Sequence, residues 1–280
     1  MLNSNGVIVS SLKLVEEDLI HSLLTAFSIQ ESIRLKKNNI YFLEEHYFRV
    51  IATLRRYRFG IPMNYTMSFF EEQIQKLTEV HKNISENNLL NLHFFLSRGK
   101  TQFVISFSTI EPFKFINTSY SIDIYKEAVI ASGDLSNLSP TNRGIRAMSK
   151  RYAEENGFED VLLLNEQKNI VESLVGTLYL LQGNQILTPG LESGCQDFTY
   201  RSAFNKWLNK KQTIYSLIEN DVNPFELQKS EEVMILSLEK GFQSVSNYRK
   251  TTYPQRKAEE IFNAFNDSFF LVITWVIWSI

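Results

Sequence analysis

Apolar runs of strand length alternate with amphipathic segments of helix length in both halves of the chain, and this alternation constrains the fold more than any other feature. In the first half, residues 43–58 carry apolar side chains at three- and four-residue spacing, which predicts an amphipathic helix. A second helix is predicted over residues 66–80, and a hairpin of two strands over residues 89–96 and 102–108 follows it.

The second half repeats this alternation with shorter strands. The predicted elements are strands at 121–131, 161–164, 170–175, 177–181, 185–188 and 233–237, and helices at 143–156, 199–217 and 255–265. The pattern loosens around Pro112, which makes residues 111–120 the best linker. The sequence therefore predicts an α/β (α+β) fold in two domains, residues 1–115 and 121–266, with an apolar tail at 267–280.

Charge and cysteine content exclude several classes of protein. The 29 Lys and Arg residues nearly balance 31 Asp and Glu residues, so the chain lacks the basic field of a general nucleic-acid binder. Cys195 is the single cysteine, which excludes a disulfide framework and a cysteine-built metal site and favours a reducing, cytoplasmic setting. The four histidines show no metal-ligand spacing, so no metal is expected; they are His21, His46, His81 and His93.

The C-terminal segment Phe269–Ile280 reads FFLVITWVIWSI. A membrane-spanning helix needs about 20 apolar residues, so this segment is too short to cross a bilayer. Two interpretations stay open for it. It is either a terminal strand or helix packed on the core or on a partner subunit, or a surface that contacts a membrane or another protein. The first 14 residues lack the pattern of a secretory signal peptide.

Two separated segments carry a resemblance to a known family. The first reads ESIR at residues 31–34 and IYFLEEHYFR at 40–49; the second reads SKRYAEENGFEDVLLLN at 149–165 and continues to IVE at 170–172. Their order and spacing resemble the class IV aminotransferases, the fold-type IV pyridoxal-phosphate proteins, which include branched-chain and D-amino-acid aminotransferases and 4-amino-4-deoxychorismate lyase. The resemblance implies that fold, pyridoxal phosphate as cofactor, a homodimer, and an interdomain cleft for an amino-acid-like substrate or small anion.

The resemblance also assigns cofactor-binding positions. Arg49 falls where the family places its phosphate arginine, and His46 lies three residues before it, on the same face of the predicted helix. Glu172 falls where the family places the acid that faces the pyridine nitrogen. Thr199 and Ser237 fall in the two segments that form the family's phosphate cup.

The family's Schiff-base lysine is missing. Its position is occupied by Ser139, and none of the 17 lysines lies in the 23 positions between Lys126 and Lys150. Serine has no amine and cannot form the imine. The phosphate cup also departs from the pattern, because Phe198 stands where the family has a glycine. No residue of this chain is therefore assigned as catalytic.

Three hypotheses follow for the function. The chain is a degenerate family member that has lost Schiff-base catalysis and is retained as a small-anion-binding or partner protein. Alternatively, it is an active pyridoxal-phosphate-dependent aminotransferase or 4-amino-4-deoxychorismate lyase that uses another amine. A third hypothesis is new chemistry in the same cleft, with the hydroxyl groups of Ser139 or Thr141.

Overall fold

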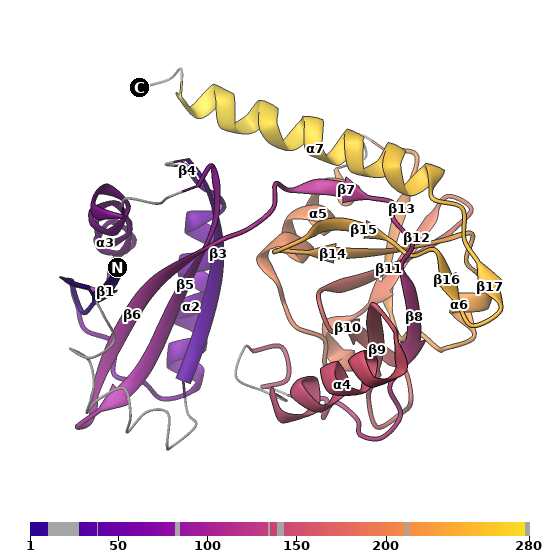
Figure 1. Ribbon diagram of the computed structural model, residues 1–280, viewed down its shortest axis with the longest axis horizontal. Helices are drawn as coiled ribbons and strands as arrows, with labels where there is room; N and C mark the ends of the chain where they lie inside the picture. The colour runs from indigo at the N-terminus through magenta and orange to yellow at the C-terminus, as the bar shows by residue number, and fades with distance from the viewer. Residues whose placement is uncertain are drawn as a thin grey trace. The chain divides into compact units, whose positions relative to one another are not determined.

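The structure is a computed structural model that describes residues 1–10, 28–37, 39–81, 85–133, 135–138, 143–210 and 213–277, with side chains described up to residue 268. The chain divides into two compact units (Figure 1). Unit 1 contains residues 1–112 together with Leu138, and unit 2 contains the other described residues. Each unit has its own hydrophobic core.

Among the described residues of unit 1, six strands form one antiparallel sheet in the order β2-β1-β6-β5-β3-β4. The strands are β1 Leu2–Ser4, β2 Val7–Val9, β3 Ser28–Lys36, β4 Asn39–Ile40, β5 Asn87–Ser97 and β6 Lys100–Thr109. The long β5–β6 hairpin is the one that the sequence predicts, and Arg98 and Gly99 form its turn, both with positive φ. The hairpin and β3 provide the surface on which the helices of unit 1 pack.

Helices α2 (Leu43–Arg56) and α3 (Met67–Val80) confirm the two helices predicted for the first half. Helix α3 begins at Thr66, whose hydroxyl accepts a hydrogen bond from the backbone N–H of Phe69 at 3.1 Å. Both helices turn their apolar faces inward, where Leu54 and Leu77 are fully buried. Figure 1 shows α2 lying along the sheet beside β3 and β5.

Unit 2 contains two sheets among its described residues. One sheet has the order β10-β9-β8-β16-β17, and the other has the order β13-β12-β11-β14-β15-β7. The strands are β7 Lys114–Ile116, β8 Ser121–Ile124, β9 Asp160–Leu164, β10 Ile170–Ser173, β11 Thr177–Gln182, β12 Gln185–Pro189, β13 Ser216–Asn220, β14 Glu232–Ser237, β15 Gly241–Ser244, β16 Asn247–Tyr248 and β17 Thr251–Thr252. Parallel and antiparallel pairings occur in both sheets, so this unit is a mixed α/β structure, as the sequence predicts.

The helices of unit 2 are α4 (Arg143–Asn156), α5 (Thr199–Asn209), the short α6 (Glu226–Lys229) and α7 (Arg256–Ile277). Two predicted elements of unit 2 are shorter in the structure than predicted. The predicted helix 199–217 ends at Asn209, because Ser216–Asn220 instead pairs with β12 as the parallel strand β13. The predicted strand 121–131 ends at Ile124.

Gly176 permits a close backbone approach between the start of β11 and the end of β14. A Cβ atom built on Gly176 would overlap the carbonyl oxygen of Leu236 and lie 3.1 Å from the Cα of Ser237. Residue 176 immediately precedes β11, and Leu236 and Ser237 end the neighbouring β14. Glycine is therefore required here because a side chain has no room, and it fixes the spacing of the strand end that carries Ser237.

Helix α7 begins on a buried carboxylate. The two oxygens of Glu232 accept hydrogen bonds from the backbone N–H groups of Lys257 and Ala258 at 2.9 and 2.7 Å, which satisfies two N–H groups that the helix itself cannot pair. The helix then continues through the end predicted at residue 265 as far as Ile277. No helix of the described chain is long and apolar enough to span a membrane.

Candidate functional site

The residues that the resemblance assigns to the cofactor site lie in both units. Arg49 is on α2 of unit 1, whereas Glu172, Thr199 and Ser237 lie in unit 2. Ser139, at the lysine position, falls outside the described residues. The geometry of each unit is therefore described separately.

In unit 1, the carboxylate of Glu31 joins the two helix residues that the sequence places on one face. Glu31 is on β3 and is buried; its Oε1 lies 2.5 Å from Nδ1 of His46, and its Oε2 accepts a hydrogen bond from Arg49. Burial alone would raise the pKa of Glu31, but the positive charge of Arg49 and the hydrogen bond with His46 hold the pKa below its ordinary value. The carboxylate is thus ionised, and it anchors Arg49 to the sheet.

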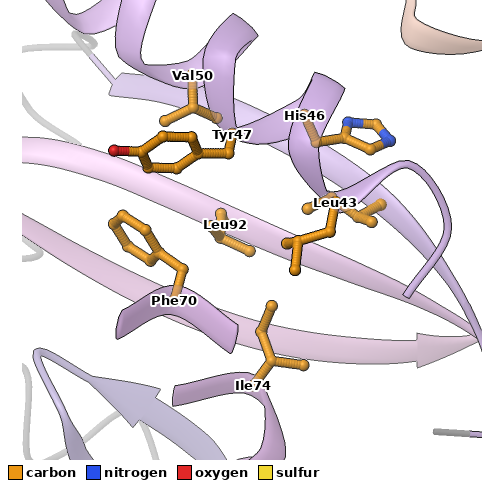
Figure 2. A pocket seen from close by; sticks show the side chains of 8 residues that line it. Leu43, His46, Tyr47, Val50, Phe70, Ile74 and Leu92 are labelled. Atoms are coloured by element: carbon orange, nitrogen blue, oxygen red, sulfur yellow. The ribbon is translucent and has the colours of Figure 1, made fainter. Parts of the chain in front are cut away.

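A small apolar hollow lies beside this cluster, between α2, α3 and the sheet. Figure 2 shows Leu43, Val50, Phe70 and Ile74 gathered around it, while the His46 ring is turned to one side. The side chains that enclose it are otherwise aliphatic or aromatic. An anion would lose its hydration there without gaining donors, so this hollow does not suit a charged ligand.

In unit 2, Glu172 is enclosed by an arginine and a backbone amide. Nε of Arg146, on α4, donates to Oε1 of Glu172 at 2.8 Å, and an Nη2 hydrogen bond reaches the same oxygen. The backbone N–H of Gln196 donates to Oε2 at 2.9 Å. The side chain of Glu172 is 2% exposed and that of Arg146 is 17% exposed, so the pair is largely withdrawn from water. Both oxygens of this carboxylate therefore have partners within the chain.

Gln196 completes this arrangement from the loop that precedes α5. With its amide oxygen turned toward the guanidinium, the Gln196 side chain accepts from Nε and Nη2 of Arg146 at 3.2 and 3.1 Å. Gln196 therefore contacts the carboxylate through its backbone and the guanidinium through its side chain. The result is a three-residue cluster, Arg146, Glu172 and Gln196, called the Arg146 cluster below.

Thr199 is the first residue of α5 and is buried. Phe198 precedes it as the N-cap residue, with φ −72° and ψ 141°. Any residue adopts this backbone conformation, so the position does not demand glycine for its dihedral angles. Arg201, two residues after Thr199, donates hydrogen bonds to the carboxylate of Glu219 at 2.6 Å and to the carbonyl of Pro189 at 2.9 Å. The start of α5 is thus held by contacts inside unit 2.

Ser237 ends β14 and is buried, with its Oγ accepting a hydrogen bond from the backbone N–H of Lys240 at 3.3 Å. Gly176 adjoins the backbone of Ser237, and the hydroxyl of Ser173 accepts from the N–H of Gly176 at 3.1 Å. Ser173 follows Glu172 directly. The strand end at Ser237 is therefore connected to Glu172 through the turn at residues 173–176.

Sequence reasoning missed two charged residues of unit 2, one paired with Glu172 and one fully buried. It assigned no role to Arg146, because nothing in a helical run of polar residues marks the one that turns toward a strand. It also assigned none to Asp160, which is fully buried on β9. Burial raises the pKa of Asp160 to about 6, against hydrogen bonds from Ser173 and the backbone N–H groups of Val161 and Leu174.

The described residues offer little for metal or thiol chemistry. They contain no group of three or more His, Cys, Asp or Glu side chains that could hold a metal ion. Cys195 is buried, and its burial raises the pKa of the thiol to about 12, so the thiol is protonated at neutral pH.

One family profile matches the sequence, and several solved structures share the fold. The sequence profile described as amino-transferase class IV matches residues 28–248. No curated protein sequence matches the chain. Among solved structures, a branched-chain aminotransferase from Thermoproteus uzoniensis with norvaline is 14% identical, with a TM-score of 0.82 and coverage of 96% of this chain and 94% of that one. The Escherichia coli branched-chain amino acid aminotransferase is 15% identical, with a TM-score of 0.81 and coverage of 96% and 93%. A candidate 4-amino-4-deoxychorismate lyase from Legionella pneumophila is 16% identical, with a TM-score of 0.76 and coverage of 88% and 92%.

Proposed function

The chain belongs to the class IV aminotransferase family and has its fold-type IV architecture, and we propose that it has lost Schiff-base catalysis with pyridoxal phosphate. The observation that carries the proposal is the lysine-free stretch of 23 residues around Ser139. Aligning the chain with the family a few residues earlier or later would still place no lysine at the Schiff-base position, because this stretch contains none. The protein keeps the fold and serves as a small-anion-binding or partner protein.

The residues at the family's positions do not fit the cofactor. A protonated pyridine nitrogen needs a carboxylate whose negative charge is not already paired, but Glu172 is paired with the guanidinium of Arg146 and also accepts a hydrogen bond from the backbone N–H of Gln196. Placing a protonated ring there would put a second cation beside a guanidinium that is paired and largely buried, with one carboxylate charge between them. This geometry supports the loss that the missing lysine suggests.

Reduction with borohydride tests this proposal directly. The purified protein is titrated with pyridoxal phosphate, absorbance is followed in the imine band, and the reduced protein is mapped by mass spectrometry. We expect no stoichiometric adduct on any single lysine. A stable adduct at one lysine would refute the proposal and favour the alternative of an active aminotransferase or 4-amino-4-deoxychorismate lyase, which the presence of Arg49 and Glu172 at the family's positions supports.

A variant in which Ser139→Lys restores the amine separates the missing lysine from the altered phosphate cup. The matched control is Met148→Lys, which adds a lysine at a position 52% exposed on α4 in the same lysine-free stretch. An imine in the Ser139→Lys variant alone means that the lysine was the only missing part. Equal, weak labelling of both variants means that the cup has been lost as well.

Arg49 is the proposed contact for a small anion. Its side chain is 15% exposed and is oriented by Glu31, so a planar guanidinium is held in place on α2 and is partly accessible. Inorganic phosphate is expected to raise the melting temperature of the wild type but not of Arg49→Gln. The control is Arg55→Gln, an exposed arginine on the same helix, which should keep the response.

The proposal includes a homodimer in the cytoplasm. Removing residues 269–280 and measuring the mass in solution tests whether the apolar tail supports association. A dimer of unchanged stability would exclude that role for the tail.

A further inference from the structure

We infer that the guanidinium of Arg146 pairs with the carboxylate of Glu172 in the free protein, and that it takes the place that a positively charged ligand ring would occupy there. This inference deepens the proposed function, because it concerns the residue in the position of the family's acid. It assigns the Arg146 cluster a positioning role in the folded protein, and it predicts that unit 2 is complete without a cofactor.

The cluster joins three separate segments of unit 2. Arg146 comes from α4, Glu172 from β10, and Gln196 from the loop between the 3-10 turn Leu191–Ser193 and α5. Each segment contributes one member, and each member contacts the other two. The cluster therefore ties the helix and the loop to the strand without help from a bound molecule.

A guanidinium is well suited to replace a protonated ring at a carboxylate. Both are planar, delocalised cations that donate N–H groups in their own plane. The guanidinium offers more donors, and Arg146 uses Nε and Nη2 on a single oxygen of Glu172. The other oxygen takes the N–H of Gln196. A protonated ring nitrogen arriving at this carboxylate would have to share its single negative charge with a guanidinium that is already paired with it.

Burial makes the pair costly to break. With 2% and 17% of the two side chains exposed, removing one partner leaves the other as a poorly solvated charge. Substituting a carboxylate that is kept free for an external ligand should have the opposite effect on the stability of the free protein. Neutralising it removes an unfavourable buried charge, and the stability of the free protein stays level or rises. The sign of the effect on the free protein thus separates the two roles.

The experiment compares melting temperatures of the purified full chain without any added ligand. We expect Glu172→Gln and Arg146→Met each to lower the melting temperature by at least about 5 °C, as for a broken buried pair in a chain of this size. The double variant Arg146→Met with Glu172→Met should recover most of that loss, because neither charge is left unpaired. The matched control is Glu155→Gln, which breaks the exposed Arg151–Glu155 pair on the same helix and should shift the melting temperature by less than about 1 °C.

An unchanged or raised melting temperature for Glu172→Gln would overturn the inference. A second measurement holds even if the variants fold poorly. Pyridoxamine phosphate carries the same ring and phosphate as pyridoxal phosphate but needs no lysine. At the same millimolar concentration it should raise the melting temperature of the wild type by no more than inorganic phosphate does, and this rise should persist in Glu172→Gln. A rise that disappears in Glu172→Gln would mean that a ring reaches Glu172 despite Arg146, and this too would overturn the inference.

The two proposals fail in distinguishable ways. A borohydride-stable adduct on a lysine elsewhere would refute the loss of Schiff-base chemistry and leave the melting-temperature series untouched. A flat melting-temperature series with no adduct would remove the role of Arg146 and leave that loss standing.

Discussion

The buried carboxyl of Asp160 predicts a pH dependence of stability that a single substitution should remove. Its Oδ1 accepts hydrogen bonds from the backbone N–H groups of Val161 and Leu174 at 2.8 and 3.1 Å, and its Oδ2 lies 3.3 Å from the hydroxyl of Tyr120. Asparagine at this position keeps the carbonyl acceptor and offers Nδ2 to the Tyr120 oxygen. The substitution Asp160→Asn therefore removes the titration with little change in contacts.

The sign and size follow from the shift in pKa. Burial raises the pKa of Asp160 from its ordinary 3.8 to about 6, so the folded state binds the proton more tightly than the unfolded state. The stability that this proton provides is complete below about pH 4 and is lost as the pH rises through about 6. The shift corresponds to about 3 kcal/mol at most. The wild type should lose this amount relative to Asp160→Asn between pH 4 and pH 7.

Urea unfolding at fixed temperature, repeated from pH 4 to pH 8, measures the difference between the two proteins. Other carboxyl groups titrate equally in both and cancel in the difference. Asp221→Asn, which removes an exposed carboxyl, is the control and should give a flat difference. Parallel curves for wild type and Asp160→Asn would refute the reasoning, because they would mean that Asp160 titrates alike in the folded and unfolded states.

Three further substitutions test contacts that lie inside unit 1 or inside unit 2. Glu232→Gln should cost about 1–2 kcal/mol in urea unfolding, because it weakens the cap of α7. The control is its neighbour Glu231→Gln, which weakens an exposed ion pair with Lys257 but keeps an oxygen for the backbone N–H of Gly183, and it should cost less. Equal losses would contradict the capping role. Gly176→Ala should destabilise by about 3 kcal/mol or more in urea unfolding, through overlap with the backbone of β14. Gly144→Ala, in open space on α4, should be neutral or stabilising in the same measurement. Glu31→Gln should cost about 3 kcal/mol at pH 7, and this cost should shrink as the pH falls through the lowered pKa of Glu31; a loss independent of pH would contradict an ionised Glu31.

Local periodicity explains which parts of the fold could be predicted. Helices α2, α3 and α4 and the β5–β6 hairpin follow from spacing within a single segment, and their bounds agree with the predictions to within three residues. Strand β13 could not be predicted in this way. It exists because β12 lies beside it in register, and that partner comes from a distant part of the chain.

The same distinction applies to the candidate site. The sequence by itself determined that no lysine stands near residue 139, since composition is independent of folding, and it placed His46 and Arg49 on one helical face. Only the tertiary structure decided that Arg146 turns toward Glu172, 26 residues away, and that Asp160 is fully buried. The sequence alone does not distinguish a charged side chain that is solvated from one that is paired with another charge. Its partner and its dielectric surroundings are fixed only when strand, helix and loop pack together.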